Sequence, residues 1–165
     1  MSTHIYKIKF SKPSYQLNDD YDRLSEIEKE KISNMEAEAF FDMDQDDKYT
    51  FFIIVKPMEL KAYLSVLNEN FIPYDINDVS DDILRGNLDV EAEITQVNPL
   101  NSLRYSFFVD DLNDWLYDNL DIDIILDRIS SIGIDSLRKI EKEFLITNCD
   151  LVTKLLNFID SKLKN

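Results

Sequence analysis

Carboxylates supply almost all of the side chains that could do chemistry in this 165-residue chain, which contains 33 Asp and Glu. Its only histidine is His4 and its only cysteine is Cys149. Because histidine is the usual proton carrier near neutral pH, a single one removes most acid–base and nucleophile designs. We expect structural roles for both residues and predict no catalytic residue. A carboxylate-based enzyme, such as a glycosidase with two paired acids, is the weakest of three hypotheses.

Metal and cofactor sites are not predicted either. One histidine and one cysteine cannot build a zinc site, and two isolated glycines cannot form a phosphate-binding loop. Asp42, Asp44 and Asp46 have the spacing of the first three ligands in a calcium loop. The match then fails, because Asp47 stands where that loop needs glycine and Ile53 where it needs a bidentate glutamate. We therefore predict no metal and no cofactor.

Charge gives the strongest functional signal. The formal net charge is −15, well beyond the 2–8 that keeps a small domain soluble. Two segments carry the excess: residues 18–47 have a net charge of −9 and residues 75–127 have −12. A sequence pI near 4.3 opposes direct binding to nucleic acid and to anionic membranes. The natural complement is a basic protein partner.

The sequence favours a reducing compartment. A single cysteine forms no internal disulfide, and the N-terminal residues lack the apolar run of a secretory signal. The longest uninterrupted apolar stretch, 51–55, is too short to cross a bilayer. We expect a cytoplasmic protein.

Hydrophobic patterning predicts the α+β class, with a single sheet of about five strands, packed helices and a helical C-terminal region. Residues 1–109 are expected to form the sheet domain, and residues 110–165 a helical region packed on it as part of one domain. The continuous apolar run 49–56 is typical of a central strand buried on both faces. The remaining strands are expected at 4–10, 71–76, 88–94 and 103–109, and helices at 20–41, from Pro57, at 80–85, around Trp115, at 122–132, from Asp135 or Ser136, and at 151–163.

One short segment resembles a known motif. Residues 125–145, ILDRISSIGIDSLRKIEKEFL, with the preceding Ile124, are similar to a helix-turn-helix tail motif at the ends of various bacterial proteins, some rhomboid-like proteases among them. That motif reads ILDKI, a glycine, SLT, then EK and a leucine, and Arg138 stands where it usually has threonine. The resemblance implies a compact helical pair and a bacterial or phage origin. It implies no activity.

The acids recur at spacings that predict charged faces. Asp19, Asp22, Glu26 and Glu30 fall three or four residues apart, which would place them on one side of a single helix from 20 to 41. An acidic loop over 42–47 would continue that row, and a second run would surround Trp115. The partner-binding candidates are Asp19, Asp22, Glu26, Glu30, Asp42, Asp44, Asp46, Asp47, Asp110, Asp111, Asp114, Trp115 and Asp118.

Aromatic residues beside these acids could anchor a partner. Tyr21, Phe41, Trp115 and Tyr117 are candidates, although core packing is the preferred interpretation for Trp115, whose helix needs a buried face. Surfaces of this kind favour a non-enzymatic inhibitor that occludes a basic, nucleic-acid-handling target such as a toxin, nuclease or defence protein. In general character such a protein resembles immunity proteins and the phage inhibitors that imitate DNA. The alternative is a structural or adaptor subunit that binds a partner through its C-terminal helices.

Overall fold

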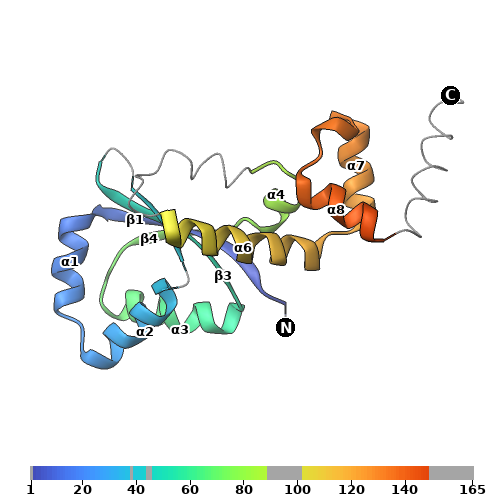
Figure 1. The fold of residues 1–165 in the computed structure, drawn as a ribbon. Helices are drawn as coiled ribbons and strands as arrows, with labels where there is room; N and C mark the ends of the chain where they lie inside the picture. Colours follow the sequence, from blue (N-terminus) through green and yellow to red (C-terminus); the bar gives the residue numbers. More distant parts are fainter. Residues whose placement is uncertain (1, 38, 44–45, 89–101, 149–165) are drawn as a thin grey trace, which may run out of the picture. The chain divides into compact units, whose positions relative to one another are not determined.

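The computed structural model describes residues 2–37, 39–43, 46–88 and 102–148. The chain divides into two compact units, Met1–Leu112 and Asn113–Asn165. The sequence had placed the division between residues 109 and 110. The α+β class is confirmed by the mixture of helices and strands in the described residues (Figure 1).

The first unit contains the sheet, and its elements follow one another along the chain as shown in Figure 1. They are β1 (His4–Pro13), α1 (Ser14–Asp22), α2 (Glu26–Ala37), β2 (Phe40–Met43), β3 (Lys48–Val55), α3 (Pro57–Glu69), β4 (Tyr74–Asp78), α4 (Ser80–Leu84) and the beginning of α6 (Ser102–Asn119).

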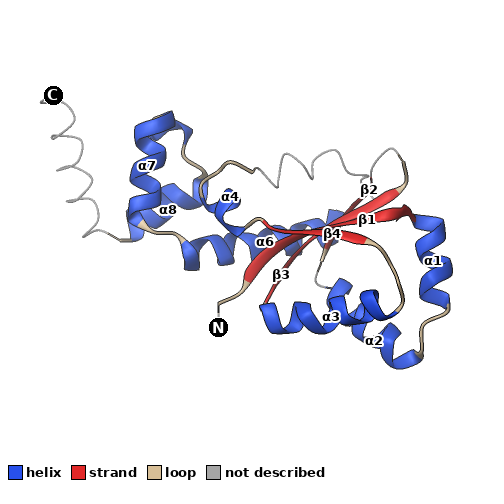
Figure 2. Ribbon diagram, turned by 180° about the vertical axis from the view of Figure 1, so that it is seen from behind, coloured by secondary structure: helices blue, strands red, loops and turns tan. Residues whose placement is uncertain are grey.

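The sheet has four strands in the order β2-β3-β1-β4. Both β3 and β4 pair with β1 in the antiparallel sense, so they run parallel to each other with β1 between them. The strands β3 and β4 therefore form a split β-α-β unit with α3 as the crossover helix, and β4 lies at Tyr74–Asp78 rather than at the predicted 71–76. In Figure 2, α2 and α3 lie on the same side of the sheet.

The central strand β3 is apolar on both faces, as its continuous hydrophobic run predicts. Phe51 and Ile53 pack into the main core, whereas Phe52 between them points to the opposite face because side chains alternate along a strand. All three side chains are at most 1% exposed. On the Phe52 side, the Phe40 ring of β2 lies 5.8 Å from the Phe108 ring of α6. Helices therefore cover both faces of this strand.

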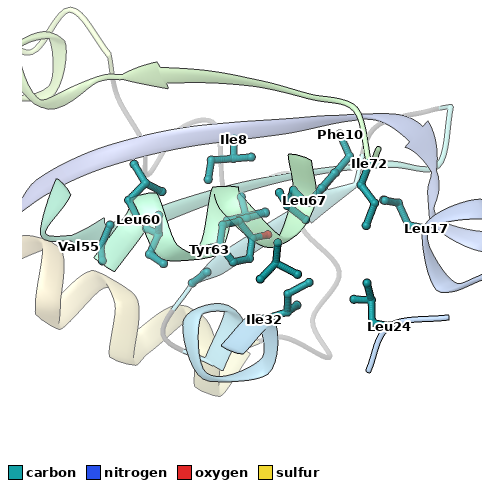
Figure 3. Packing of buried hydrophobic residues seen from close by; sticks show 14 residues of the cluster. Ile8, Phe10, Leu17, Leu24, Ile32, Val55, Leu60, Tyr63, Leu67 and Ile72 are labelled. Atoms are coloured by element: carbon teal, nitrogen blue, oxygen red, sulfur yellow. The ribbon is translucent and has the colours of Figure 1, made fainter. Parts of the chain in front are cut away.

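The main core lies between the sheet and the helices α1, α2 and α3 (Figure 3). Tyr63 of α3 is central to it, with its ring 6.0 Å from that of Phe51 in an edge-on contact. Pro57 occupies the first turn of α3, where a missing backbone N–H costs nothing. The buried members of this cluster are Ile8, Phe10, Leu17, Leu24, Ile32, Ala39, Phe51, Ile53, Val55, Leu60, Tyr63, Val66, Leu67 and Ile72.

The single helix predicted for 20–41 is wrong, because two shorter helices, α1 and α2, replace it. The chain turns between them, and Ser25 and Glu28 form a capping box at the start of α2. The Ser25 N–H donates to Glu28 Oε2 at 2.8 Å, and the Glu28 N–H reaches Ser25 Oγ at 3.4 Å. These bonds satisfy backbone donors that an uninterrupted helix would have paired internally. The turn also lets Leu24 enter the core.

The strand predicted for 103–109 is also wrong, because these residues belong to the helix α6. Their aromatic and branched residues favour a strand locally, but Phe108, Leu112, Trp115 and Leu116 recur with helical spacing and are all buried. The described sheet has four strands rather than about five, and one of them, β2, lies where a helix end and a loop were predicted. The strand predicted at 88–94 and the helix predicted at 151–163 lie outside the described residues, apart from Leu88, which is not in a strand.

Within the second unit, α7 (Ile122–Ile132) and α8 (Lys139–Thr147) form the compact helical pair that the tail motif implies. Asp121 caps α7 by accepting the Asp123 N–H at 2.8 Å, and Gly133 ends it at a positive φ of 83°. A short 3-10 turn, Ile134–Ser136, replaces the predicted helix start at Asp135 or Ser136. Leu120, Ile125, Leu137 and Leu145 form the core of this pair.

A buried carboxylate joins the two helices. Glu141 of α8 is 0% exposed, and its Oε1 lies 2.8 Å from Arg128 Nε of α7 and 2.7 Å from Arg138 Nη2. Its second oxygen accepts the Arg138 N–H at 2.7 Å at the start of α8. Arg138, the departure from the motif's threonine, is therefore one of two cations that compensate a buried charge.

We expect Glu141→Gln to lower the free energy of unfolding of the second unit by about 3 kcal/mol, since it removes the shared partner of two arginines. Denaturant unfolding followed by the fluorescence of Trp115, the only tryptophan and part of this unit, measures the effect. Glu143→Gln, at a carboxylate that is 51% exposed, is the control and should change stability by less than about 0.5 kcal/mol. Equal effects of the two substitutions would contradict a special role for Glu141.

Candidate interaction surface

The first predicted acidic row is exposed but does not lie on one helix. Asp19 and Asp22 belong to α1, whereas Glu26 and Glu30 belong to α2. All four side chains are exposed. The turn at Arg23–Ser25 separates the two pairs, so the expected continuous face is wrong.

Basic residues dilute this first row. Lys29 Nζ lies 3.3 Å from Glu26 Oε1, and Arg23 and Lys31 are exposed on the same two segments. Ion pairs at such exposed positions contribute little to stability. The local field is therefore weaker than the number of acids alone indicates.

The predicted acidic loop 42–47 is only partly a loop. Asp42 belongs to the strand β2, and Asp44 lies outside the described residues. Asp46 is exposed with its Oδ2 3.7 Å from Lys48 Nζ, and Asp47 adopts a positive φ of 58°. In the part of the chain that the structure describes, no three His, Cys, Asp or Glu side chains form a group that could hold a metal ion.

The second acidic run lies on a single helix. Asp110, Asp111, Asp114 and Asp118 are all exposed on α6, where their spacing puts them along one side of the helix. We call these four residues the α6 acidic stripe. No lysine or arginine occurs between residues 105 and 127. Four charges over about 12 Å of helix axis approach the one charge per roughly 3.4 Å of a nucleic-acid strand.

An exposed aromatic residue precedes this stripe. Phe107 is 67% exposed and lies three and four residues before Asp110 and Asp111, so helical spacing places it on their side of α6. Phe107 is not among the predicted anchors because the pattern of residues 103–109 favours a strand. The helical period running back from Trp115 was the signal that could have found it.

Three of the four aromatic residues predicted as anchors, Tyr21, Trp115 and Tyr117, are buried or partly buried. Trp115 is 5% exposed, which agrees with its core-packing interpretation. The Tyr117 ring packs edge-on against Phe144 at 5.5 Å. The Tyr21 side chain is partly buried, and no side-chain position is described for Phe41.

Tyr21 instead belongs to a polar cluster that joins three helices. Its hydroxyl donates to Glu36 Oε1 at 2.8 Å, and the Tyr63 hydroxyl donates to the same oxygen at 3.2 Å. Burial raises the pKa of Tyr21 well above its ordinary value, and the negative charge of Glu36 raises it further. Burial likewise raises the pKa of Tyr63. The two hydroxyls therefore stay protonated at neutral pH, and their hydrogen bonds to Glu36 link α1, α2 and α3.

The single histidine contacts a carboxylate. His4 Nδ1 lies 2.8 Å from Asp78 Oδ2, and His4 Nε2 lies 3.4 Å from Ser2 Oγ. Burial alone would raise the pKa of Asp78, but hydrogen bonds from Ser80 and His4 lower it overall. Ser2, His4 and Asp78 are thus linked in the order of a Ser-His-Asp catalytic triad of hydrolases. However, the His4 and Asp78 side chains are 37% and 43% exposed and Ser2 precedes the first strand, so we interpret the pair as a link between β1 and β4.

Glu28 connects α2 to the end of α3. Its Oε1 accepts a hydrogen bond from Asn70 Nδ2 at 2.9 Å, while Oε2 accepts the Ser25 hydroxyl at 2.5 Å. The Ser25 hydroxyl, then the Asn70 amide and the Ser25 N–H, lower the pKa of Glu28 to about 2. This carboxylate therefore keeps its negative charge throughout the physiological pH range.

No protein-family model matches the chain, and no match was found among curated proteins or solved structures. Among the described residues, no helix has the length and apolar character needed to cross a membrane. Function is therefore inferred from the surface itself.

Glu28→Gln should lower the thermal midpoint at pH 7, and the gap from wild type should close as the pH falls. Because the pKa of Glu28 is lower in the folded state than its ordinary 4.5, the stabilisation is present above about pH 4.5 and is lost toward pH 2. Thermal unfolding followed by circular dichroism between pH 7 and pH 2 measures it. Glu26→Gln controls for the loss of one exposed charge. A gap of constant size would show that ionised Glu28 contributes nothing.

Proposed function

We propose that this protein is a non-enzymatic inhibitor that binds a basic, nucleic-acid-handling protein and occludes its nucleic-acid site. The α6 acidic stripe carries the proposal: four exposed aspartates follow one helix inside a segment that contains no lysine or arginine. A cationic groove shaped for a phosphate backbone would meet a comparable row of negative charges here. The net charge of −15 exceeds what solubility requires.

The stripe acts mainly on recognition and association rate. Opposite potentials accelerate encounter and exclude partners with a negative surface, whereas buried contacts supply most of the affinity. Phe107, which is 67% exposed on the stripe's side of α6, offers such a contact. Occupation of the basic groove by the protein excludes nucleic acid without any chemical step. Immunity proteins and phage inhibitors that imitate DNA share this mode of action, and a cytoplasmic location would suit either role.

Replacing Asp110, Asp111, Asp114 and Asp118 together by asparagine should weaken capture of a basic protein by roughly tenfold or more. Pull-downs from the host extract at about 50 mM and about 500 mM salt, with the captured protein then purified for titration, provide the measurement. The control variant changes four exposed acids on other elements: Asp75→Asn, Asp82→Asn, Asp127→Asn and Glu143→Gln. Capture that is insensitive to salt, or lost equally in both variants, would contradict the role of the stripe.

A second candidate function rests on the second unit. Ile132, Ile134 and Ile146 are 48%, 46% and 71% exposed, so the helical pair presents apolar side chains to solvent. These residues favour an adaptor or structural subunit that binds a partner through its C-terminal helices.

Replacing Ile132, Ile134 and Ile146 together by serine discriminates the two functions. An adaptor that uses these exposed apolar side chains should lose its partner, whereas an inhibitor that uses the α6 acidic stripe should retain it within roughly twofold. The same pull-down at low salt measures both outcomes, and Trp115 fluorescence verifies that the triple variant is folded. Retention of the partner by the triple variant would contradict the adaptor function.

A further inference from the structure

Phe71 combines an unfavourable backbone conformation with an unburied side chain. Its φ is +55°, in the left-handed region that a bulky residue rarely adopts. Its side chain is 88% exposed. The residue therefore carries a backbone cost without gaining burial of its ring.

The strain arises where α3 ends. The Ile72 N–H bonds to the Leu67 carbonyl at 2.9 Å, and the Phe71 N–H bonds to the Asn68 carbonyl at 3.2 Å. This is the Schellman pattern, in which the residue just past the helix takes a left-handed conformation and is usually glycine. Ile72 and Leu67 are both buried, and an apolar pair at these two positions frequently accompanies the motif. The motif thus requires a left-handed backbone conformation at residue 71, but the Phe71 ring takes no part in it.

At its other positions of positive φ, the described chain has glycine or a short polar residue. Its only two glycines, Gly86 and Gly133, both occupy positive φ, at 68° and 83°. Asp47 also has a positive φ, which a short polar side chain tolerates. Among the positive-φ positions of the described residues, Phe71 alone carries a large apolar side chain. A phenyl group kept there at a cost indicates a contact with something outside the chain.

Glutamate residues occur near Phe71 in the chain and on the helix α2, which is bonded to the residue before it. The hydrogen bond between Asn70 Nδ2 and Glu28 Oε1 ties the residue before Phe71 to α2. Ile27, which precedes Glu28 in α2, is 68% exposed and is a second exposed apolar side chain on the helix that this bond reaches. Residues 26–31 and 68–72 together contain four glutamates and two lysines, and three of the glutamates, Glu26, Glu30 and Glu69, are exposed. We call Ile27 and Phe71 with these three exposed glutamates the Phe71 patch.

We propose that the Phe71 patch is a docking site in which the Phe71 ring packs against apolar side chains flanked by Lys or Arg on a basic protein partner. Charge complementarity selects this occupant: the three exposed glutamates, in a chain with a net charge of −15, attract cationic side chains, and the whole chain repels both an anionic membrane and a second copy of itself. An arginine beside the ring gains in addition from its aromatic face. The choice of a cationic partner rests on the proposed function, whereas the anchoring role of Phe71 comes from its own conformation.

The first experiment tests whether Phe71 serves the fold. Phe71→Gly should unfold at a temperature equal to or above that of wild type, because glycine relieves the left-handed strain and no buried ring is lost. Met58→Ala, at a 67% exposed side chain in the first turn of α3, is the matched control. A midpoint for Phe71→Gly several degrees below that of Met58→Ala would overturn the proposal, since the ring would then stabilise the fold.

The second experiment tests binding with a defined probe, a displayed library of short random peptides selected on the immobilised wild-type protein. The expected peptides combine Lys or Arg with an apolar residue. They should bind Phe71→Gly at least tenfold more weakly, and Met58→Ala unchanged. Equal binding to Phe71→Gly, enrichment of peptides without basic residues, or no enrichment would each overturn the proposal. So would a wild-type dimer in sedimentation that Phe71→Gly dissociates, because the occupant would then be a second copy.

Different experimental outcomes would overturn the proposed function and the proposed docking site. If the captured basic protein is lost from the α6 acidic stripe variant but binds Phe71→Gly normally, the proposed function stands and the Phe71 patch is not the docking site. If selected cationic peptides need Phe71 while the stripe variant captures the basic protein as well as wild type does, the patch stands and the role of the stripe is overturned.

Discussion

Burial of β3 on both faces is the constraint on which the first unit depends. Phe51 and Phe52 are adjacent in the chain and must point to opposite sides of the sheet, yet both are at most 1% exposed. The burial of Phe51 requires α1, α2 and α3, and the burial of Phe52 involves β2 and the first half of α6. An exposed strand of this composition would pair with other chains and aggregate.

Local polar contacts then decide where the helices begin. Glu28 accepts a hydrogen bond from the Ser25 N–H, and Glu141 accepts one from the Arg138 N–H. In each case a carboxylate three residues further along the chain fixes the first turn of the helix. The same two carboxylates also bind across elements, to Asn70 and to Arg128 respectively. Carboxylates that complete the fold in this way are not available to a partner. The acids that remain exposed are the ones that can serve recognition.

The surface combines two features that solubility alone does not explain. Four aspartates follow α6 without an intervening cation, and an exposed phenyl ring is held in a left-handed conformation at the end of α3. Each has a cost, in electrostatic self-repulsion for the first and in backbone strain for the second. Among the described residues, neither cost is offset by a side-chain contact that would stabilise the fold. The proposed binding to a basic protein would give both features a use.

The sequence alone determined the class, the buried central strand, the Pro57 start of α3, the Gly133 end of α7 and the clustering of charge, because each follows from spacing or from the properties of single residues. It misassigned 103–109 because aromatic and branched residues favour a strand locally, and only packing against Phe40 and the helical period of the following residues reveal a helix. Tertiary structure also decided which acids are internal. Glu141 and Glu143 are two residues apart in the chain, but only Glu141 points between two arginines, since side-chain direction depends on how helices pack.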